Sequence, residues 1–134
     1  MRSAVLLLFI AVFVLVGCGS GGSSQTANIG GTWVGTWASQ TYPGAGGQFI
    51  MIVTQSGSTF SGTAQMTNSC FGMLQISGSV AGNNFIATLS GGGRDRISAS
   101  GSVAGNTIMG AYRTLDLAGT NCLIDQGTFN GVRS

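Results

Sequence analysis

The chemistry open to this sequence depends mainly on its three cysteines, because the chain of 134 residues contains no histidine, lysine or glutamate. Cys18 follows an N-terminal apolar run, whereas Cys70 and Cys122 lie far along the chain. A thiol can carry a lipid, pair with a second thiol, or bind a metal ion. The surroundings of each cysteine indicate which of these reactions it undergoes.

The residues around Cys18 favour lipid attachment. Leu15-Val16-Gly17-Cys18 resembles the lipobox of bacterial lipoproteins, which implies that Cys18 is diacylated, with chains such as palmitate, and becomes the mature N-terminus. Arg2 and the apolar run Ala4–Val16 are typical of a signal peptide, here residues 1–17. The run is shorter than the about 20 residues of a transmembrane helix. An uncleaved anchor and a signal peptide cut elsewhere remain open as alternatives.

The implied lipid anchor also predicts a location. Each buried methylene contributes about 0.8 kcal/mol, so two or three acyl chains hold a protein permanently at a membrane. Gly19 follows the cysteine at the position where Asp signals retention in the inner membrane. The resemblance therefore implies the outer membrane in a two-membrane bacterium, and otherwise the outer face of the cell membrane.

The other two cysteines favour a disulfide. Export would place Cys70 and Cys122 in an oxidising compartment, where a pair of thiols is most simply joined. Closing a loop of this length contributes roughly 4 kcal/mol in the chain-entropy model. Zinc binding is the alternative, but two thiols without a histidine make a poor zinc site. We expect a Cys70–Cys122 disulfide and neither a metal nor a cofactor.

Downstream of the signal, the pattern predicts a linker and one all-β domain. Residues 18–30 are rich in Gly and Ser and predict a flexible linker. In residues 31–134, apolar and small polar residues alternate between recurring turn signals, which favours strands. The strands are expected at residues 31–38, 48–55, 58–67, 73–80, 84–90, 95–103, 107–113 and 125–133. The large apolar residues on their inward phase are Trp33, Trp37, Phe49, Met51, Val53, Phe60, Ala64, Met66, Leu74, Ile76, Val80, Phe85, Leu89, Ile97, Val103, Ile108, Tyr112 and Phe129.

Glycines on the same inward phase indicate that the sheet closes. A glycine within a strand marks a bend or a close backbone approach, and repeated bends let a sheet curl shut. We therefore expect an eight-stranded antiparallel up-and-down barrel in place of a flat sandwich. The glycines concerned are Gly35, Gly62, Gly78, Gly101, Gly110, Gly127 and Gly131.

The connections predict two different ends. Ser56-Gly57, Gly82-Asn83 and Gly105-Asn106 are typical of tight two-residue hairpins, while the other connections are longer or rich in glycine. Alternate connections of a meander lie at opposite ends, so the tight turns form a closed end and the long loops an open end. Cys70 and Cys122 both fall in open-end loops, which agrees with a disulfide between them.

Near-identical segments at residues 77–83 and 100–106 indicate a duplicated hairpin within the barrel. A β-solenoid is the competing interpretation, but a stable stack requires at least three repeats.

Several segments resemble a group of small bacterial lipoproteins with a lipocalin-like barrel. They are Gly31–Trp37, Val53–Thr63, Gly127–Phe129 and the two repeated segments. Gly31-Thr-Trp33 is similar to the Gly-x-Trp signature of lipocalins, which implies that Trp33 plugs the barrel floor. The arginine that accompanies this tryptophan in lipocalins has no secure position in the sequence.

Catalysis and nucleic-acid binding are not expected. Without His, Lys or Glu, no serine or threonine has an ordinary general base, and three scattered Asp residues offer no acid/base pair. The nearly neutral mature chain has no basic patch for nucleic acid. Asp95 lies between Arg94 and Arg96, which indicates a locally neutralised loop edge.

Two non-enzymatic functions remain. An eight-stranded barrel is either filled by side chains or holds one small ligand, so the chain is a carrier of a small hydrophobic molecule or an envelope module that binds a protein or glycan through its open-end loops. The residues expected to contact a ligand, unless they simply cap the core, are Trp33, Trp37, Tyr42, Phe71, Tyr112, Leu115 and Leu117.

Overall fold

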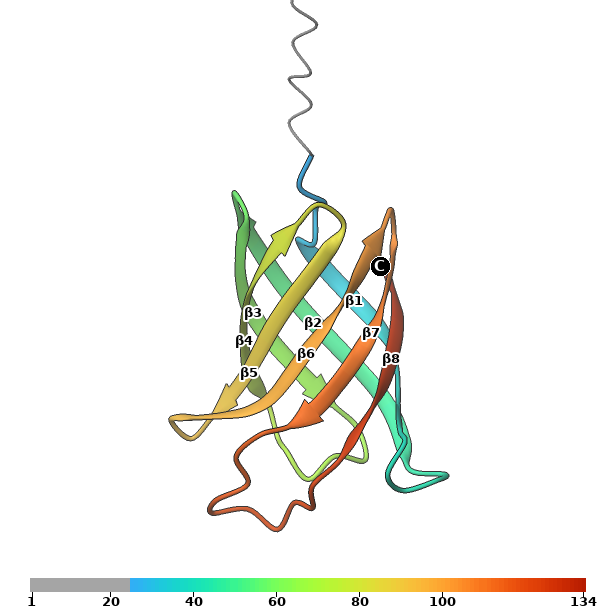
Figure 1. The fold of residues 1–134 in the computed structure, drawn as a ribbon, viewed down its shortest axis with the longest axis vertical. Coiled ribbons are helices and arrows are strands. Elements are labelled where there is room, and N and C mark those ends of the chain that lie inside the picture. The colour runs from blue at the N-terminus through green and yellow to red at the C-terminus, as the bar shows by residue number, and fades with distance from the viewer. Residues whose placement is uncertain (1–24) are drawn as a thin grey trace, which may run out of the picture.

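The computed structural model describes residues 25–134, which form a closed barrel of eight antiparallel strands (Figure 1). Each strand pairs with the next along the chain, and the last pairs with the first to close the barrel. The predicted signal peptide and Cys18 lie outside the described residues. The predicted fold class is confirmed. The strands are β1 (Gly31–Ser39), β2 (Gly46–Ser56), β3 (Thr59–Met66), β4 (Leu74–Ala81), β5 (Asn84–Gly91), β6 (Arg94–Ala104), β7 (Thr107–Thr114) and β8 (Gln126–Arg133).

Alternation along the strands separates the core from the solvent face. In β2, Phe49, Met51 and Val53 are buried, whereas Ile50 and Ile52 remain about half exposed. All the residues predicted to face inward are buried or partly buried. Because side chains of a strand point to opposite faces in turn, this one phase fills the barrel interior.

The inward glycines permit the close strand contacts of a small barrel. A Cβ atom at Gly62 would collide with the carbonyl oxygen of Ile52, and one at Gly101 with that of Met109. At Gly35 the space that a side chain would need is taken by the backbone of β8 and the Phe49 ring. The prediction that these glycines accompany closure is confirmed.

The two ends of the barrel differ as predicted. Gly57, Gly82 and Gly105 occupy the tight turns with φ of 60°, 58° and 58°, a conformation that glycine adopts without strain. Figure 1 shows these turns beside the entering chain, and the long loops at the opposite end. The Cys70–Cys122 disulfide joins two of the long loops, with the Cα atoms 5.5 Å apart.

Residues assigned to the linker by sequence instead cover the closed end. Ile29 is completely buried, and its amide donates to the Gln55 side chain at 2.6 Å. The Ala27 amide donates to the Gly82 carbonyl at 2.8 Å. The expected boundary at Gly30 is therefore a few residues too late, because a single apolar residue among polar neighbours gave too weak a signal of packing.

Trp33 lies next to this segment, on the side of the barrel interior, and is also completely buried. Its indole N–H donates to the Ile29 carbonyl at 2.8 Å, and the Arg133 guanidinium lies 4.5 Å from the ring centre. Arg133 also donates to the carbonyls of Asn28 and Gly30. We call Ile29, Trp33 and Arg133 the floor. Arg133 provides the arginine partner that the sequence left unplaced.

A bulge in β6 changes the contacts that Arg94, Asp95 and Arg96 make. The register with β5 shifts between Leu89 and Ser90, so the consecutive residues Arg96 and Ile97 are both buried. Arg96 donates to the carbonyls of Asp116 and Ala118 at 3.0 and 2.7 Å. Arg96 thus fastens the β7–β8 loop to the barrel.

The prediction that Arg94, Asp95 and Arg96 neutralise one another is wrong because of the same bulge. Arg94 pairs with Asp116 across the loop at 2.9 Å, and the adjacent Asp95 stays exposed. The Ala118 amide and the Arg94 guanidinium lower the pKa of Asp116. Sequence neighbours are a poor guide to charge pairs where a bulge alters the direction of side chains.

Candidate ligand-binding site

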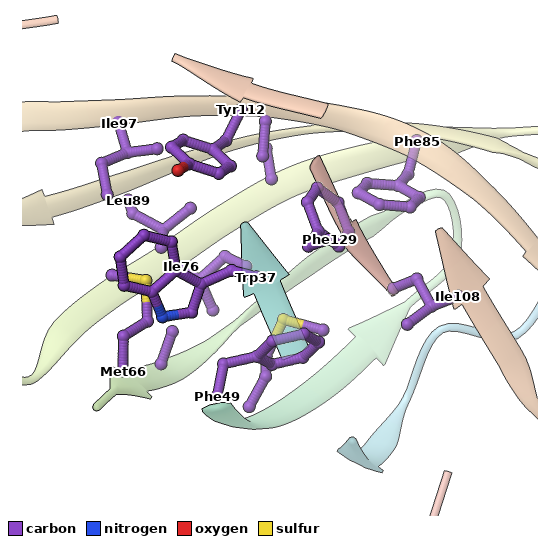
Figure 2. A pocket seen from close by; sticks show the side chains of 14 residues that line it. Trp37, Phe49, Met66, Ile76, Phe85, Leu89, Ile97, Ile108, Tyr112 and Phe129 are labelled. Atoms are coloured by element: carbon purple, nitrogen blue, oxygen red, sulfur yellow. The ribbon is translucent and has the colours of Figure 1, made fainter. Parts of the chain in front are cut away.

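The barrel interior contains an apolar chamber of about 70 Å³, to which every strand contributes (Figure 2). We call it the inner chamber. Three alanines, one each on β3, β5 and β6, leave space that larger residues would fill. The lining residues are Trp37, Phe49, Met51, Ala64, Met66, Ile76, Phe85, Ala87, Leu89, Ile97, Ala99, Ile108, Tyr112 and Phe129.

Aromatic rings close the inner chamber toward the floor. Phe129 packs edge-on against Phe49 and obliquely against Phe85, with ring centres 6.1 and 6.2 Å apart. Figure 2 shows Phe85, Phe129 and Ile108 at one end, and Trp37 at the other end with Met66. Edge contacts of this kind are favourable beyond their buried area. The chamber therefore has an aromatic base on the floor side, and Trp37 and Met66 lie at its other end.

A second hollow of about 290 Å³ lies among the open-end loops, and we call it the vestibule. It is lined by both aromatic and polar residues, including Tyr42, Phe71, Asn121 and Asp125. Trp37, Met66, Ile97 and Tyr112 line the vestibule and the inner chamber alike. These four shared residues lie between the two hollows and separate them, and we call them the neck.

A hydrogen-bonded group anchors the polar side of the neck. The Tyr112 hydroxyl donates to Asp125 Oδ2 at 2.8 Å, and the Ser39 hydroxyl donates to Oδ1 at 2.6 Å. Burial and the hydrogen bond to Asp125 raise the pKa of Tyr112 above its ordinary value. The phenol therefore stays neutral and keeps its proton directed at the carboxylate.

Trp37 completes the neck with its indole group. Its ring meets Tyr112 edge-on, with centres 6.1 Å apart and an angle of 82° between the planes. Its N–H donates to the Thr67 carbonyl at 3.1 Å. The one nitrogen donor of the neck side chains is therefore already engaged.

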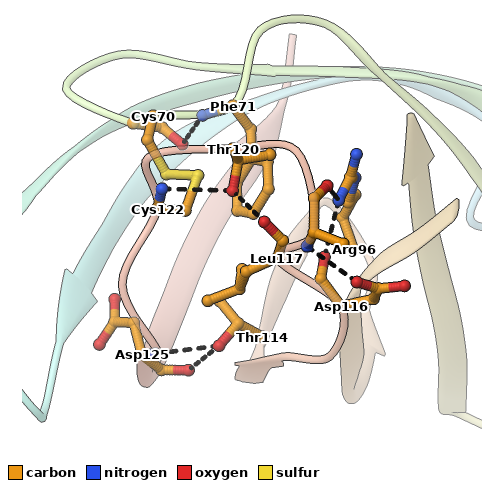
Figure 3. The surroundings of a disulfide bond; sticks show 11 residues. Cys70, Phe71, Arg96, Thr114, Asp116, Leu117, Thr120, Cys122 and Asp125 are labelled. Carbon is orange, nitrogen blue, oxygen red and sulfur yellow. Dashed lines mark hydrogen bonds between the residues drawn. A yellow bond between two sulfur atoms is a disulfide. The ribbon is translucent and has the colours of Figure 1, made fainter. Parts of the chain in front are cut away.

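The disulfide fixes one rim of the vestibule (Figure 3). Phe71, which follows Cys70, is buried, and the Cys122 amide donates to the Thr120 hydroxyl at 3.2 Å. Together with the Arg96 contacts, this bond restrains the β7–β8 loop from both sides. The vestibule is thus built from ordered loops.

The structure places the sequence-predicted ligand residues in three different environments. Trp37 and Tyr112 lie at the neck, and Tyr42 and Phe71 line the vestibule. Trp33 belongs to the floor and does not line either hollow.

The two remaining candidates also lie outside both hollows. Leu117 packs against the core, while Leu115 is 46% exposed. Asp125 and Ser39 were missed, although the place of Asp125 directly before the last strand, at the predicted open end, was a usable signal.

In the part of the chain that the structure describes, no cluster of three or more His, Cys, Asp or Glu residues is arranged to hold a metal ion. Residues 25–134 also contain no helix with the length and apolar character needed to cross a membrane.

The closed barrel and its tryptophan floor define a lipocalin-like fold. Among solved structures, the chain is similar to that of EF1p2_mFAP2b bound to DFHBI, with a TM-score of 0.54 and 15% sequence identity over 78% of this chain and 93% of that chain. At this level of identity the similarity concerns the fold alone. No protein-family model matches the sequence, and no curated protein matches it.

Proposed function

We propose that this protein is a lipid-anchored envelope lipoprotein whose barrel binds one small hydrophobic ligand. The observation that carries the proposal is the apolar inner chamber, which only the side chains of the neck separate from a roomier vestibule. The structure of similar fold, EF1p2_mFAP2b, is bound to DFHBI, which supports small-molecule binding by a barrel of this kind. The proposal assigns no catalytic chemistry to the protein.

The size of the inner chamber limits what can enter it. Its 70 Å³ is several times the roughly 10–15 Å³ that one water molecule requires. A short alkyl group fits this space, whereas a ring, which an apolar cavity of about 150 Å³ accepts, would enter only if the side chains around the chamber moved apart. The rest of a ligand would occupy the vestibule. Burying about 100 Å² of apolar surface contributes about 2.5 kcal/mol. The inner chamber alone would therefore bind weakly, and contacts at the neck must add affinity.

Filling the inner chamber provides the direct test. Ala99 lines it, so Ala99→Leu would occupy the ligand space without removing any contact. We expect at least a roughly tenfold loss of affinity for an apolar probe such as propylbenzene, which corresponds to about 1.4 kcal/mol. Calorimetric titration of the purified protein measures this change.

Ala111→Leu is the matched control because Ala111 is exposed on the outer face of β7. It makes the same chemical change outside the inner chamber and should leave affinity unchanged. Equal affinity in both variants, or no propylbenzene binding by the unmodified protein, would refute ligand binding in the inner chamber. Mass spectrometry of an organic extract of the protein would identify any natural ligand.

The proposed anchor has its own test. Because Cys18 is the acceptor in the lipobox-like segment, Cys18→Ser should move the protein from the membrane to the soluble fraction and leave the barrel folded. Cell fractionation detects the move, and acyl labelling shows that the lipid is absent. Retention of the unacylated variant at the membrane would contradict the assignment. For the unmodified protein, Gly19 favours the outer membrane, so recovery solely from the inner membrane would contradict that location.

A second candidate function is an interaction module that acts through the open-end loops. Leu123, Ile124 and Met73 are 66%, 76% and 62% exposed at that end, which is unusual for large apolar residues grouped on loops. Polar replacements of these three residues would abolish capture of an envelope protein or glycan if the loops bind it. Leu123 lines the vestibule, but Met73 and Ile124 line neither hollow, so replacing only those two should leave propylbenzene affinity unchanged and separates the two functions.

A further inference from the structure

We infer that the ligand carries a hydrogen-bond-donating cationic group, an amine, which binds at the Tyr112–Asp125 pair while its apolar body enters the inner chamber. This inference rests on the proposed function and specifies the chemical class of the ligand. Three separate observations support it: the hydrogen-bond directions at the neck, the placement of charges, and the aromatic surroundings.

The hydrogen-bond directions at the neck leave oxygen acceptors available to a ligand, while the donors are already engaged within the protein. The hydroxyl protons of Tyr112 and Ser39 both point to Asp125, so the lone pairs of their oxygens remain on the outer side of each bond. Ser39 already accepts the Tyr42 amide at 2.9 Å, whereas Tyr112 Oη accepts no hydrogen bond within residues 25–134. With the Trp37 N–H engaged by Thr67, the neck is suited to a ligand donor and unsuited to a ligand carboxylate.

The charges near the neck also favour a cationic ligand. Within residues 25–134 the single ion pair joins Arg94 to Asp116, so Asp125 has no cationic partner. Arg96 is occupied by loop carbonyls, and Arg133 by the floor. Arg113 lies on the outward phase of β7, one residue from Tyr112. The Asp125 side chain on the vestibule wall is therefore available to pair with a bound cation.

The aromatic rings of the neck add to this preference. Trp37 and Tyr112 both line the vestibule and the inner chamber, and aromatic faces attract a cation. A compound with an ammonium group a few bonds from a ring would place the cation at the neck and the ring in the inner chamber. A long acyl chain ending in a carboxylate would match neither hollow.

Three probes with the same phenylethyl body test the inference on the full-length protein: phenethylamine ends in an ammonium group, hydrocinnamate in a carboxylate and propylbenzene in a methyl group. We expect phenethylamine to bind at least about tenfold more tightly than hydrocinnamate, as hydrogen bonds to charged groups allow. Asp125→Asn should remove about tenfold of the phenethylamine affinity and leave propylbenzene affinity unchanged. All protein variants are titrated in one buffer, so that partition of a given probe into detergent affects every variant equally.

Asp95→Asn is the matched control, since it makes the same charge change at an exposed position at the same end of the barrel. It should leave all three affinities unchanged. Tyr112→Phe provides a second variant, which keeps the ring and removes the acceptor oxygen, and it should weaken phenethylamine binding by a clearly larger factor than propylbenzene binding. Retained propylbenzene binding shows that each variant barrel is folded.

The outcomes separate the two claims. If propylbenzene binds but phenethylamine gains nothing over hydrocinnamate, or keeps its affinity in both neck variants, the amine inference is overturned and ligand binding stands. If no probe binds the unmodified protein, the proposed function itself fails and the inference fails with it.

Discussion

Replacing Trp33 with alanine is expected to lower the free energy of unfolding by about 3–5 kcal/mol, the usual cost of truncating a fully buried tryptophan. Trp33 is completely buried, and the change would also leave the Ile29 carbonyl without its indole donor. Arg133 would lose the ring on which its guanidinium lies. Urea denaturation followed by circular dichroism measures the loss.

Trp37→Ala is the control, because it removes the same side chain from the same face of β1 four residues further along. Trp37 is only partly buried and lies at the neck, so its removal should cost less stability and chiefly alter ligand affinity. A Trp33 variant as stable as the unmodified protein would show that the floor does not hold the barrel. Equal stability losses in the two variants would argue against the division of β1 into a structural and a ligand-facing tryptophan.

Reduction of the Cys70–Cys122 disulfide should lower stability by up to roughly 4 kcal/mol in the chain-entropy model. The bond spans 52 residues and joins loops that form the vestibule, so the loss of amide protection should concentrate at the open end. The closed end depends on tight turns and on the floor, and its amides should stay protected. Hydrogen exchange of the oxidised and reduced protein compares the two ends.

Gly82-Asn83 and Asn121-Cys122 are the informative positions, since they lie at the closed and open ends. Equal loss of protection at both would show that the disulfide stabilises the barrel as a whole and not the vestibule. The double variant Cys70→Ser with Cys122→Ser should reproduce the reduced state and exclude effects of the reductant. A count of two free thiols at these positions in the oxidised protein would remove the bond itself.

The fold could be predicted because one simple pattern governs almost the whole domain. Strands of period two, glycines on the inward phase and turns that require positive φ all specify the same closed meander. The bounds observed for the strands differ from the predicted ones by two residues at most. Prediction was wrong for the floor segment and for Arg96, because both depend on contacts with residues distant in sequence.

The candidate site was predictable only in part. Trp37 and Tyr112 follow from inward phase and position near the open end, and the structure places both at the neck. Trp33 shares that inward phase but belongs to the floor, below the rings of Phe49, Phe85 and Phe129. This position depends on depth along the barrel, which the period of the strands does not predict. The role of Asp125 depends on Tyr112 of the neighbouring strand β7 and on Ser39 of β1, and only closure of the barrel brings Ser39 close.

The packing of Ala27–Gly30 has a mechanical consequence. Tension on the chain that precedes Gln25 would reach the barrel through these residues, which bond to Gln55 on β2, to the β4–β5 turn at Gly82 and to Arg133 on β8. The load would be shared among several strands at once and would not peel β1 away from its neighbours. The open end of the barrel lies opposite these bonds and would therefore keep its shape under such a load.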